Sequence, residues 1–149
     1  MTAARGLSLV LVVLCGPSRL EAACTVSATA VNFGTYDVFE TTPDTSTGTI
    51  AYHCGTKDKN VQIAISKGSS TTFSPRRMNN GTEALAYNLY QDAAFSVIWG
   101  DGTNGTGVFT TANPPNNQDV NLPVYGRIPS QQDVSVGNYS DTVIVTISF

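Results

Sequence analysis

The sequence predicts an all-β protein built as one antiparallel β-sandwich. Apolar residues alternate with polar ones in a series of short segments, and turn sequences rich in Gly, Asn and Pro separate these segments. No stretch shows the 3.6-residue periodicity of an amphipathic helix. Strands at this spacing without intervening helices are typical of a sandwich, and the lack of repeats and linkers indicates a single domain.

The C-terminal segment has the clearest alternation. One face of a strand over residues 143–149 would carry only apolar side chains, namely Val143, Val145, Ile147 and Phe149. The other face would carry Ile144, Thr146 and Ser148, which is the pattern of a half-buried strand. No residue follows that could form a further edge strand, so we expect an incomplete sandwich whose last strand is open for a partner to pair with.

The remaining strands are expected from the same alternation. The inward residues of four interior strands would be Ile50, Tyr52 and Cys54; Val61, Ile63 and Ile65; Leu85, Tyr87 and Leu89; and Val120, Leu122 and Val124. His53 would then point outward. In the first segment Val26, Ala28 and Ala30 share one parity, whereas Val31 and Phe33 take the other. This change of phase indicates a β-bulge or a switch from one sheet to the other.

Residues 1–22 are expected to be a secretory signal peptide, with cleavage near Ala22 or Ala23 and a mature domain over residues 23–149. Arg5 provides a basic start, and the apolar run over residues 7–14 is too short to span a bilayer, which needs roughly 20 residues. A lipoprotein site at Cys24 is a less consistent alternative, because Glu21 stands where an aliphatic residue would be expected. We therefore favour cleavage by ordinary signal peptidase.

The cysteines indicate a disulfide. Cys15 would leave with the signal peptide, and Cys24 and Cys54 would remain in an oxidising compartment, where a disulfide is the default. Closing a loop of this length should stabilise the fold by roughly 3–4 kcal/mol. A metal site or a nucleophilic pair would need clustered His and Cys partners that the sequence lacks.

Composition excludes nucleic acid as a partner. Without Arg5, Arg19 and Glu21 the chain has six basic and ten acidic residues, and among the basic ones only Arg76 and Arg77 are adjacent. Such a distribution cannot form the basic surface that nucleic-acid binding needs. Charged residues make up 13% of the sequence, which suits a secreted β-protein rich in Thr, Ser, Asn and Gly.

The sequence predicts no catalytic residue, metal or cofactor. His53 is the sole histidine, no G-x-S-x-G nucleophile turn occurs, and no glycine loop suited to phosphate is present. The loop over residues 100–105 lacks the carboxylate spacing of a calcium site and is interpreted as a turn. Trp99, Tyr87 and Tyr90 could form a sugar-binding platform, but core packing is the simpler interpretation for Tyr87 and Trp99.

Three ordered blocks carry a family resemblance. The first is CTV at residues 24–26 with FGTY at 33–36, and the second is YNLYQDA at 87–93 with WGDG at 99–102. The third runs from VYGRIP at residues 124–129 through GNYSDT at 137–142 to Phe149. In this order the blocks resemble the spore coat protein U family, which includes pilin subunits of the archaic chaperone–usher pathway of Gram-negative bacteria.

The resemblance implies an immunoglobulin-like sandwich that lacks its final strand, with a disulfide joining the first two strands. A periplasmic chaperone lends a strand, and at the outer-membrane usher a neighbouring pilin subunit replaces it. The acceptor groove would be bordered by the first and last strands, at Val26, Ala28, Val31, Val143, Val145, Ile147 and Phe149. Residues 137–139 also resemble the tyrosine corner of such folds. The implied location is the cell surface, reached through the periplasm, with roles in adhesion and biofilm formation.

One departure from the family bears on function. Polymerising pilins of this type carry an alternating apolar segment before the first cysteine, whereas the expected cleavage leaves at most one residue before Cys24. The sequence therefore predicts a subunit that accepts a donor strand without giving one, which suits a terminal or non-polymerising subunit. The alternative is a self-standing secreted coat protein or carbohydrate-binding adhesin that closes its own fold.

Overall fold

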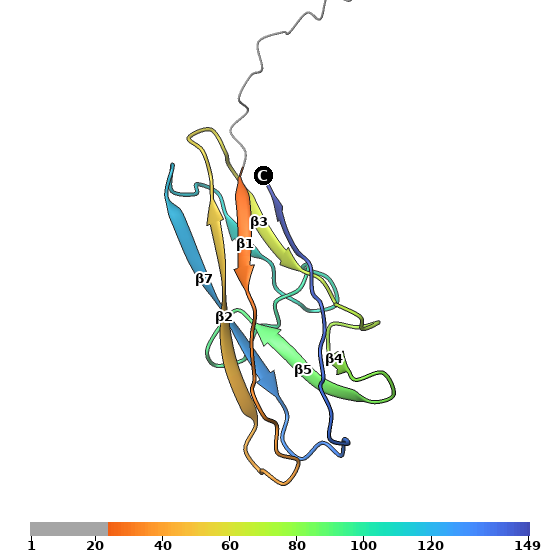
Figure 1. Ribbon diagram of the computed structural model, residues 1–149. Coiled ribbons are helices and arrows are strands. Elements are labelled where there is room, and N and C mark those ends of the chain that lie inside the picture. The colour runs from red at the N-terminus through yellow and green to blue at the C-terminus, as the bar shows by residue number, and fades with distance from the viewer. Residues whose placement is uncertain (1–23) are drawn as a thin grey trace, which may run out of the picture.

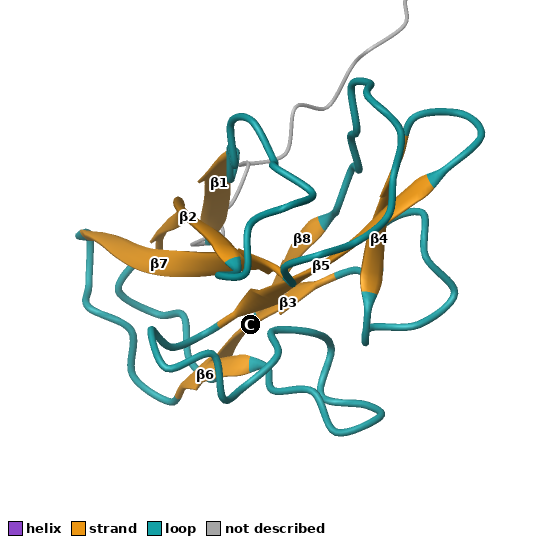
Figure 2. Ribbon diagram, turned by 90° about the horizontal axis from the view of Figure 1, so that it is seen from below, coloured by secondary structure: helices purple, strands orange, loops and turns teal. Residues whose placement is uncertain are grey.

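The computed structural model describes residues 24–149 and consists there of strands and loops (Figures 1 and 2). The strands are β1 (Thr25–Thr29), β2 (Asp44–His53), β3 (Val61–Ile65), β4 (Arg76–Asn79), β5 (Ala84–Tyr90), β6 (Phe109–Thr111), β7 (Asp119–Ile128) and β8 (Val145–Ser148). No helix in this part of the chain is long and apolar enough to cross a membrane. The expected signal peptide, its cleavage site and Cys15 lie outside the described residues.

The strands form two antiparallel sheets that pack as an immunoglobulin-like sandwich. The larger sheet has the order β1-β2-β7-β5-β4, and the smaller has the order β6-β3-β8. The longest pairing joins β2 and β7 from Asp44↔Ile128 to His53↔Asp119. This architecture confirms the predicted all-β sandwich.

Alternation along the strands places the core between the sheets, as predicted. The innermost apolar side chains include Ile50, Tyr52, Val61, Ile63, Ile65, Leu85, Leu89 and Val124. Cys54 is fully buried, while the neighbouring His53 side chain is 43% exposed. Alternation does not predict β4 and β6, because β4 is a polar run and β6 has only three residues.

The first segment changes phase for a reason that differs from the prediction. Pairing of β1 with β2 ends at Thr29↔Thr49, and Val31 and Phe33 then pack against the core without joining a strand of either sheet. Glycines make room for this crossing: a Cβ at Gly48 would lie 2.8 Å from the Thr29 carbonyl oxygen, and one at Gly126 would lie 2.6 Å from Phe33. The phase change is therefore a crossing over the inner face of the sheet, and neither a bulge nor a sheet switch.

Candidate functional site

Two edge strands that face each other define the candidate site. β1 is an edge of the larger sheet, and β8 is an edge of the smaller one. They lie side by side and run in opposite directions (Figure 1). Within residues 24–149 no pairing joins them, so each presents a row of unpaired backbone N–H and C=O groups.

An apolar groove of about 310 Å³ lies between these edges. One wall comes from residues 28–31 and Phe33, and the other comes from residues 141–143 and Val145. The floor is formed by core side chains, namely Ile50, Ile65, Met78, Tyr87, Leu89 and Val124. A groove with unpaired backbone on its walls and apolar side chains on its floor is suited to an added strand with alternating apolar residues.

The structure places the predicted groove residues in three ways. Ala28, Val31, Val143 and Val145 line the groove. Val26 and Ile147 are half-buried against the core but do not line it. Phe149 departs from the expectation, because its side chain is 54% exposed. β8 ends at Ser148, so no strand pairing holds Phe149 against the core.

Asp141 positions the start of the C-terminal wall. Its Oδ2 accepts a hydrogen bond of 2.7 Å from the Tyr87 hydroxyl, and its Oδ1 accepts one of 2.9 Å from the Ser69 N–H. Burial, and then the bond to Asp141, raise the pKa of Tyr87 well above its usual value, so its hydroxyl stays protonated as a donor. Asp141 thus fixes this wall to the groove floor and to the loop after β3.

A tyrosine corner holds the loop that leads into the last strand. The Tyr139 hydroxyl lies 2.9 Å from the Ser135 carbonyl oxygen and 3.0 Å from Glu83 Oε2, both of which are acceptors. Glu83 also accepts hydrogen bonds from the Ser135 N–H at 2.6 Å and from the Ser135 hydroxyl at 2.8 Å. The Ser135 donors, together with Tyr139, lower the pKa of the Glu83 carboxyl. The hydrogen bond from the Tyr139 hydroxyl to the Ser135 carbonyl oxygen is the one that a tyrosine corner makes to the backbone a few residues upstream.

A buried arginine joins the two sheets away from the groove. Arg76 of β4 is fully buried, and its guanidinium donates to the carbonyl oxygens of Ser66 at 3.0 Å and Trp99 at 2.6 Å. It also donates to Asn88 Oδ1 at 2.8 Å and lies 5.3 Å from the centre of the Phe73 ring. Burial lowers the pKa of Arg76. In the sequence Arg76 stands out only as part of a basic pair with Arg77, and no local pattern predicts this role.

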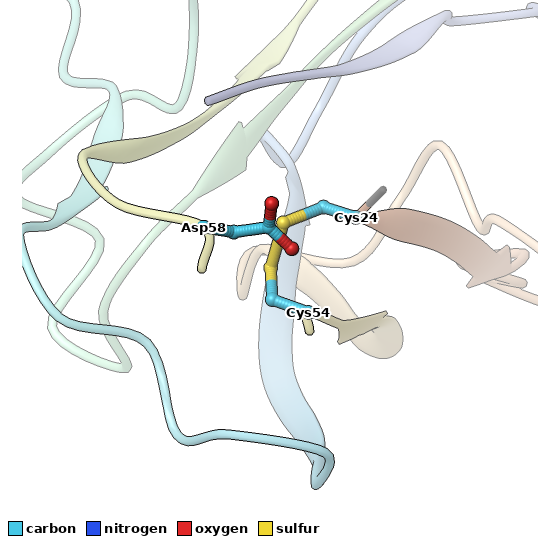
Figure 3. Close-up of side chains that lie close together, drawn as sticks. All are labelled: Cys24, Cys54 and Asp58. Atoms are coloured by element: carbon cyan, nitrogen blue, oxygen red, sulfur yellow. A yellow bond between two sulfur atoms is a disulfide. The ribbon is translucent and has the colours of Figure 1, made fainter. Parts of the chain in front are cut away.

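A disulfide joins Cys24, just before β1, to Cys54, just after β2, with an S–S distance of 2.05 Å (Figure 3). Asp58 lies beside it, and its Oδ2 accepts a hydrogen bond of 2.7 Å from the Gly55 N–H. Within residues 24–149 these three residues form the only cluster of potential metal ligands, and the two sulfur atoms are bonded to each other. The arrangement pins the edge strand β1 to its neighbour β2.

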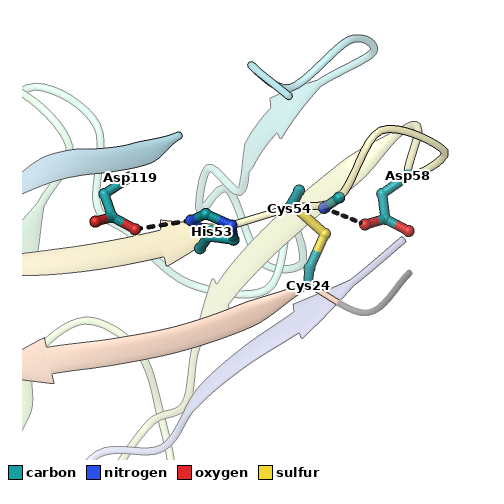
Figure 4. Close-up of polar contacts among 6 residues, drawn as sticks. Cys24, His53, Cys54, Asp58 and Asp119 are labelled. Atoms are coloured by element: carbon teal, nitrogen blue, oxygen red, sulfur yellow. Dashed lines mark hydrogen bonds and ion pairs between the residues drawn. A yellow bond between two sulfur atoms is a disulfide. The ribbon is translucent and has the colours of Figure 1, made fainter. Parts of the chain in front are cut away.

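His53 makes a surface pair with its cross-strand neighbour. Its Nδ1 lies 2.9 Å from Asp119 Oδ1, and the two side chains are 43% and 81% exposed (Figure 4). In the described part of the chain no hydroxyl or thiol is hydrogen-bonded to the imidazole. The pair is thus a cross-strand contact of the kind that stabilises a sheet by a fraction of a kcal/mol up to about 1 kcal/mol.

The aromatic candidates separate into core and surface. Trp99 is 2% exposed, and its Nε1 donates to the Ile63 carbonyl oxygen at 2.9 Å. Tyr87 is 5% exposed, so both residues belong to the core as the sequence analysis preferred. Tyr90 is half-buried and packs edge-on against Phe95, with 5.4 Å between ring centres.

The open apolar groove between β1 and β8 places this protein in the class of β-sandwiches that lack one strand at an edge. The chain belongs to the Spore Coat Protein U domain family, whose profile matches residues 10–146. It is 35% identical over 150 residues to Protein U of Myxococcus xanthus, an alignment that covers 89% of this chain and 80% of that protein.

Its fold is similar to that of a solved pilus complex. The match is to a chain in the CsuC–CsuE chaperone–tip adhesion subunit pre-assembly complex, from the archaic chaperone–usher Csu pili of Acinetobacter baumannii. The TM-score is 0.61 at 23% sequence identity, with 87% of this chain aligned to 40% of that chain. This chain therefore spans less than half the length of that one, and a likeness at this identity supports the fold.

Proposed function

We propose that this protein is a structural subunit of a cell-surface pilus or coat, assembled through the chaperone–usher pathway by donor-strand complementation. The observation that carries the proposal is the apolar groove between the unpaired edges of β1 and β8. A strand inserted there would form main-chain hydrogen bonds with both edges. Its alternate side chains would replace solvent over the groove floor.

The proposed partners are a periplasmic pilus chaperone, an outer-membrane usher and neighbouring pilin subunits. Membership of the spore coat protein U family supports this choice, as does a fold shared with a chain from a chaperone–subunit complex. The route would lead through the periplasm to the surface of a Gram-negative cell. The disulfide between Cys24 and Cys54 suits such an oxidising compartment.

Energetics favour a donor strand that is already ordered. Each buried side chain of Val or Leu size contributes about 1.5–3 kcal/mol, whereas fixing each backbone residue of a free peptide costs about 1–2 kcal/mol. For a short free peptide these terms nearly cancel, and the net gain comes from hydrogen bonds of about 0.5–1.5 kcal/mol each. A chaperone presents its strand preorganised, so we expect it to bind more tightly than a free peptide of the same sequence.

Co-purification with the cognate chaperone tests the proposal. Wild-type protein expressed in the periplasm with that chaperone should form a stoichiometric complex. Val145→Asp places a charge on the groove wall and should abolish the complex, whereas Thr146→Asp, on the exposed face of the same strand, should retain it. No complex with wild type, or equal retention by both variants, would overturn the proposal.

The position in the fibre is a further part of this proposal. The expectation of a terminal or non-polymerising subunit depends on residues 1–23, which lie outside the described part of the chain. N-terminal sequencing of the exported protein tests it directly. A mature chain that begins at Ala23 or Cys24 supports a subunit that only accepts a strand, whereas a longer N-terminus would contradict it.

A further inference from the structure

A second hollow, of about 340 Å³, lies where β5 and β7 pair, and we call it the Arg127 pocket. Its walls include three prolines, Pro43, Pro75 and Pro129, together with the ring of Tyr90. Arg127 and Asn88 face each other in the strand register and line the pocket, as do Ser74 and Ser130. Tyr87 lines both this pocket and the groove between β1 and β8, and the other residues of the Arg127 pocket do not line the groove.

Each polar side chain of the Arg127 pocket can donate a hydrogen bond, although the Ser74 and Ser130 hydroxyls can also accept one. Within residues 24–149 no carboxylate lies within ion-pair distance of Arg127, and a guanidinium has donors but no acceptor. Asn88 is 5% exposed, and its Oδ1 already accepts from Arg76 Nη1 at 2.8 Å and from the Leu89 N–H at 3.1 Å. Its amide NH₂ is thus the group left for a ligand. The pocket is complementary to an acceptor, and best to an anion.

A strained turn orients the Arg127 guanidinium. Phe95 has a φ of 55°, in the left-handed region that a bulky aromatic residue rarely adopts. Asp92 holds this turn by accepting hydrogen bonds from the N–H groups of Ala94, Ser96 and Val97. The Phe95 ring consequently lies against Tyr90 on one side and 5.3 Å from the Arg127 guanidinium carbon on another. Retained backbone strain of this kind is a feature of functional sites.

We propose that the Arg127 pocket binds a uronic acid unit of an acidic glycan. The carboxylate of the sugar would accept hydrogen bonds from Arg127 and the Asn88 amide, and the C–H face of its ring would pack on Tyr90 and the prolines. A peptide strand fits less well, because β5 and β7 are paired to each other here and offer no free edge. The volume lies at the lower end of the range for small-molecule sites, which suits a single sugar unit.

The inference is tested by measuring the binding of D-galacturonic acid to the full mature protein by NMR titration. Wild type should bind saturably, and D-galactose, which lacks the carboxylate, should bind at least tenfold more weakly. Arg127→Gln should weaken galacturonate binding by at least tenfold, because it removes the charge-assisted hydrogen bond to the carboxylate. Arg77→Gln, at an exposed arginine of β4, is the matched control and should bind like wild type.

Several results would overturn the inference. These are the absence of saturable binding to wild type, equal binding of galactose, and unchanged binding by Arg127→Gln. Acetate or a tri-aspartate peptide that binds as tightly as galacturonate would also refute recognition of a sugar.

A second variant, Phe95→Leu, keeps Arg127 but removes the aromatic ring that lies against its guanidinium. This variant should weaken binding while leaving the circular dichroism spectrum unchanged. Arg127 does not line the groove and Val145 does not line the Arg127 pocket, so the result is independent of the chaperone experiment.

Discussion

The two flanks of the sandwich are closed in different ways. On the closed flank, Arg76 of β4 donates to the carbonyl oxygens of Ser66 and Trp99. Asn79, also in β4, pairs with Ser140 through two backbone hydrogen bonds of 2.9 and 3.1 Å. On the open flank, between β1 and β8, no hydrogen bond within residues 24–149 joins the two edges, and an apolar groove separates them. The same sandwich therefore joins its sheets by hydrogen bonds on one side and leaves the backbone of β1 and β8 unpaired with each other on the other.

This difference shows where the fold is self-sufficient. The closed flank uses a buried charge, which is costly unless it is hydrogen-bonded. Each of the three guanidinium nitrogens of Arg76 donates to a backbone oxygen or to Asn88. Under the proposed function, a strand from a partner would supply the equivalent hydrogen bonds on the open flank. Substitutions on the closed flank should thus change the stability of the isolated chain, whereas those in the groove should chiefly change its response to a partner.

Removing the buried arginine should have the largest effect. Arg76→Ala would remove the donor to the carbonyl oxygens of Ser66 and Trp99 and create a cavity, so we expect a loss of about 3–5 kcal/mol in the free energy of unfolding. Urea denaturation measures this loss. Arg77→Ala, at the exposed neighbour, should stay within about 0.5 kcal/mol of wild type. Equal effects of the two substitutions would show that the closed flank does not depend on Arg76.

The disulfide should rank next, because it holds β1 at the edge of the open flank. A crosslink over a sequence separation of 30 residues is expected to stabilise the fold by about 3–4 kcal/mol. The double variant Cys24→Ala/Cys54→Ala avoids a free thiol and should lose about that amount in the same urea experiment. Two free thiols in the mass spectrum of non-reduced wild type would contradict the expected bond.

Acid should weaken the loop that leads into the open flank. Donors from Ser135 and Tyr139 lower the pKa of Glu83 below its usual 4.5, so the folded state favours the carboxylate. Its stabilising contribution is present above pH 4.5 and is lost as the pH falls through the lower folded-state value. Glu83→Gln should therefore flatten the decrease in melting temperature between roughly pH 5 and pH 2. Parallel curves for variant and wild type would contradict this assignment.

His53 should have the smallest effect, because it lies on the outer face of β2. His53→Ala would remove an exposed pair with Asp119, and we expect a change within about 0.5 kcal/mol and unaltered surface assembly. Immunoblotting of sheared surface material measures assembly. Loss of assembly with an intact fold would reveal a site at His53 that its surroundings do not indicate.

Alternation predicted the sheets and much of the groove. Alternation separated the two faces of the last strand, and the structure shows which one is inward: Val143, Val145 and Ile147 are half-buried, whereas Ile144 is 65% exposed. Side-chain period is a local property that depends only on the strand backbone, so it could be inferred without tertiary information. Phe149 was misplaced because the strand ends one residue earlier, and strand ends depend on the pairing partner.

Features that depend on distant contacts escaped the sequence analysis. Burial of Arg76 requires the carbonyls of Ser66 and Trp99 to converge, and no local pattern signals such convergence. The same holds for the Arg127 pocket, where Phe95, Tyr90 and Arg127 meet from separate segments. Turn sequences and alternation specify where strands begin and which face is buried, but they do not specify which polar groups meet across the sheets.

The open flank is tested most directly by the melting temperature of the purified mature protein with and without a donor peptide of alternating apolar residues. At a peptide concentration near 100 times its Kd, binding should add about 2.7 kcal/mol of stability and raise the melting temperature by on the order of 10 °C. A scrambled peptide without alternation should have no effect, and Val145→Asp should abolish the response. A monodisperse monomer that melts cooperatively at high temperature, unmoved by any donor strand, would show that the fold is already complete and contradict the account.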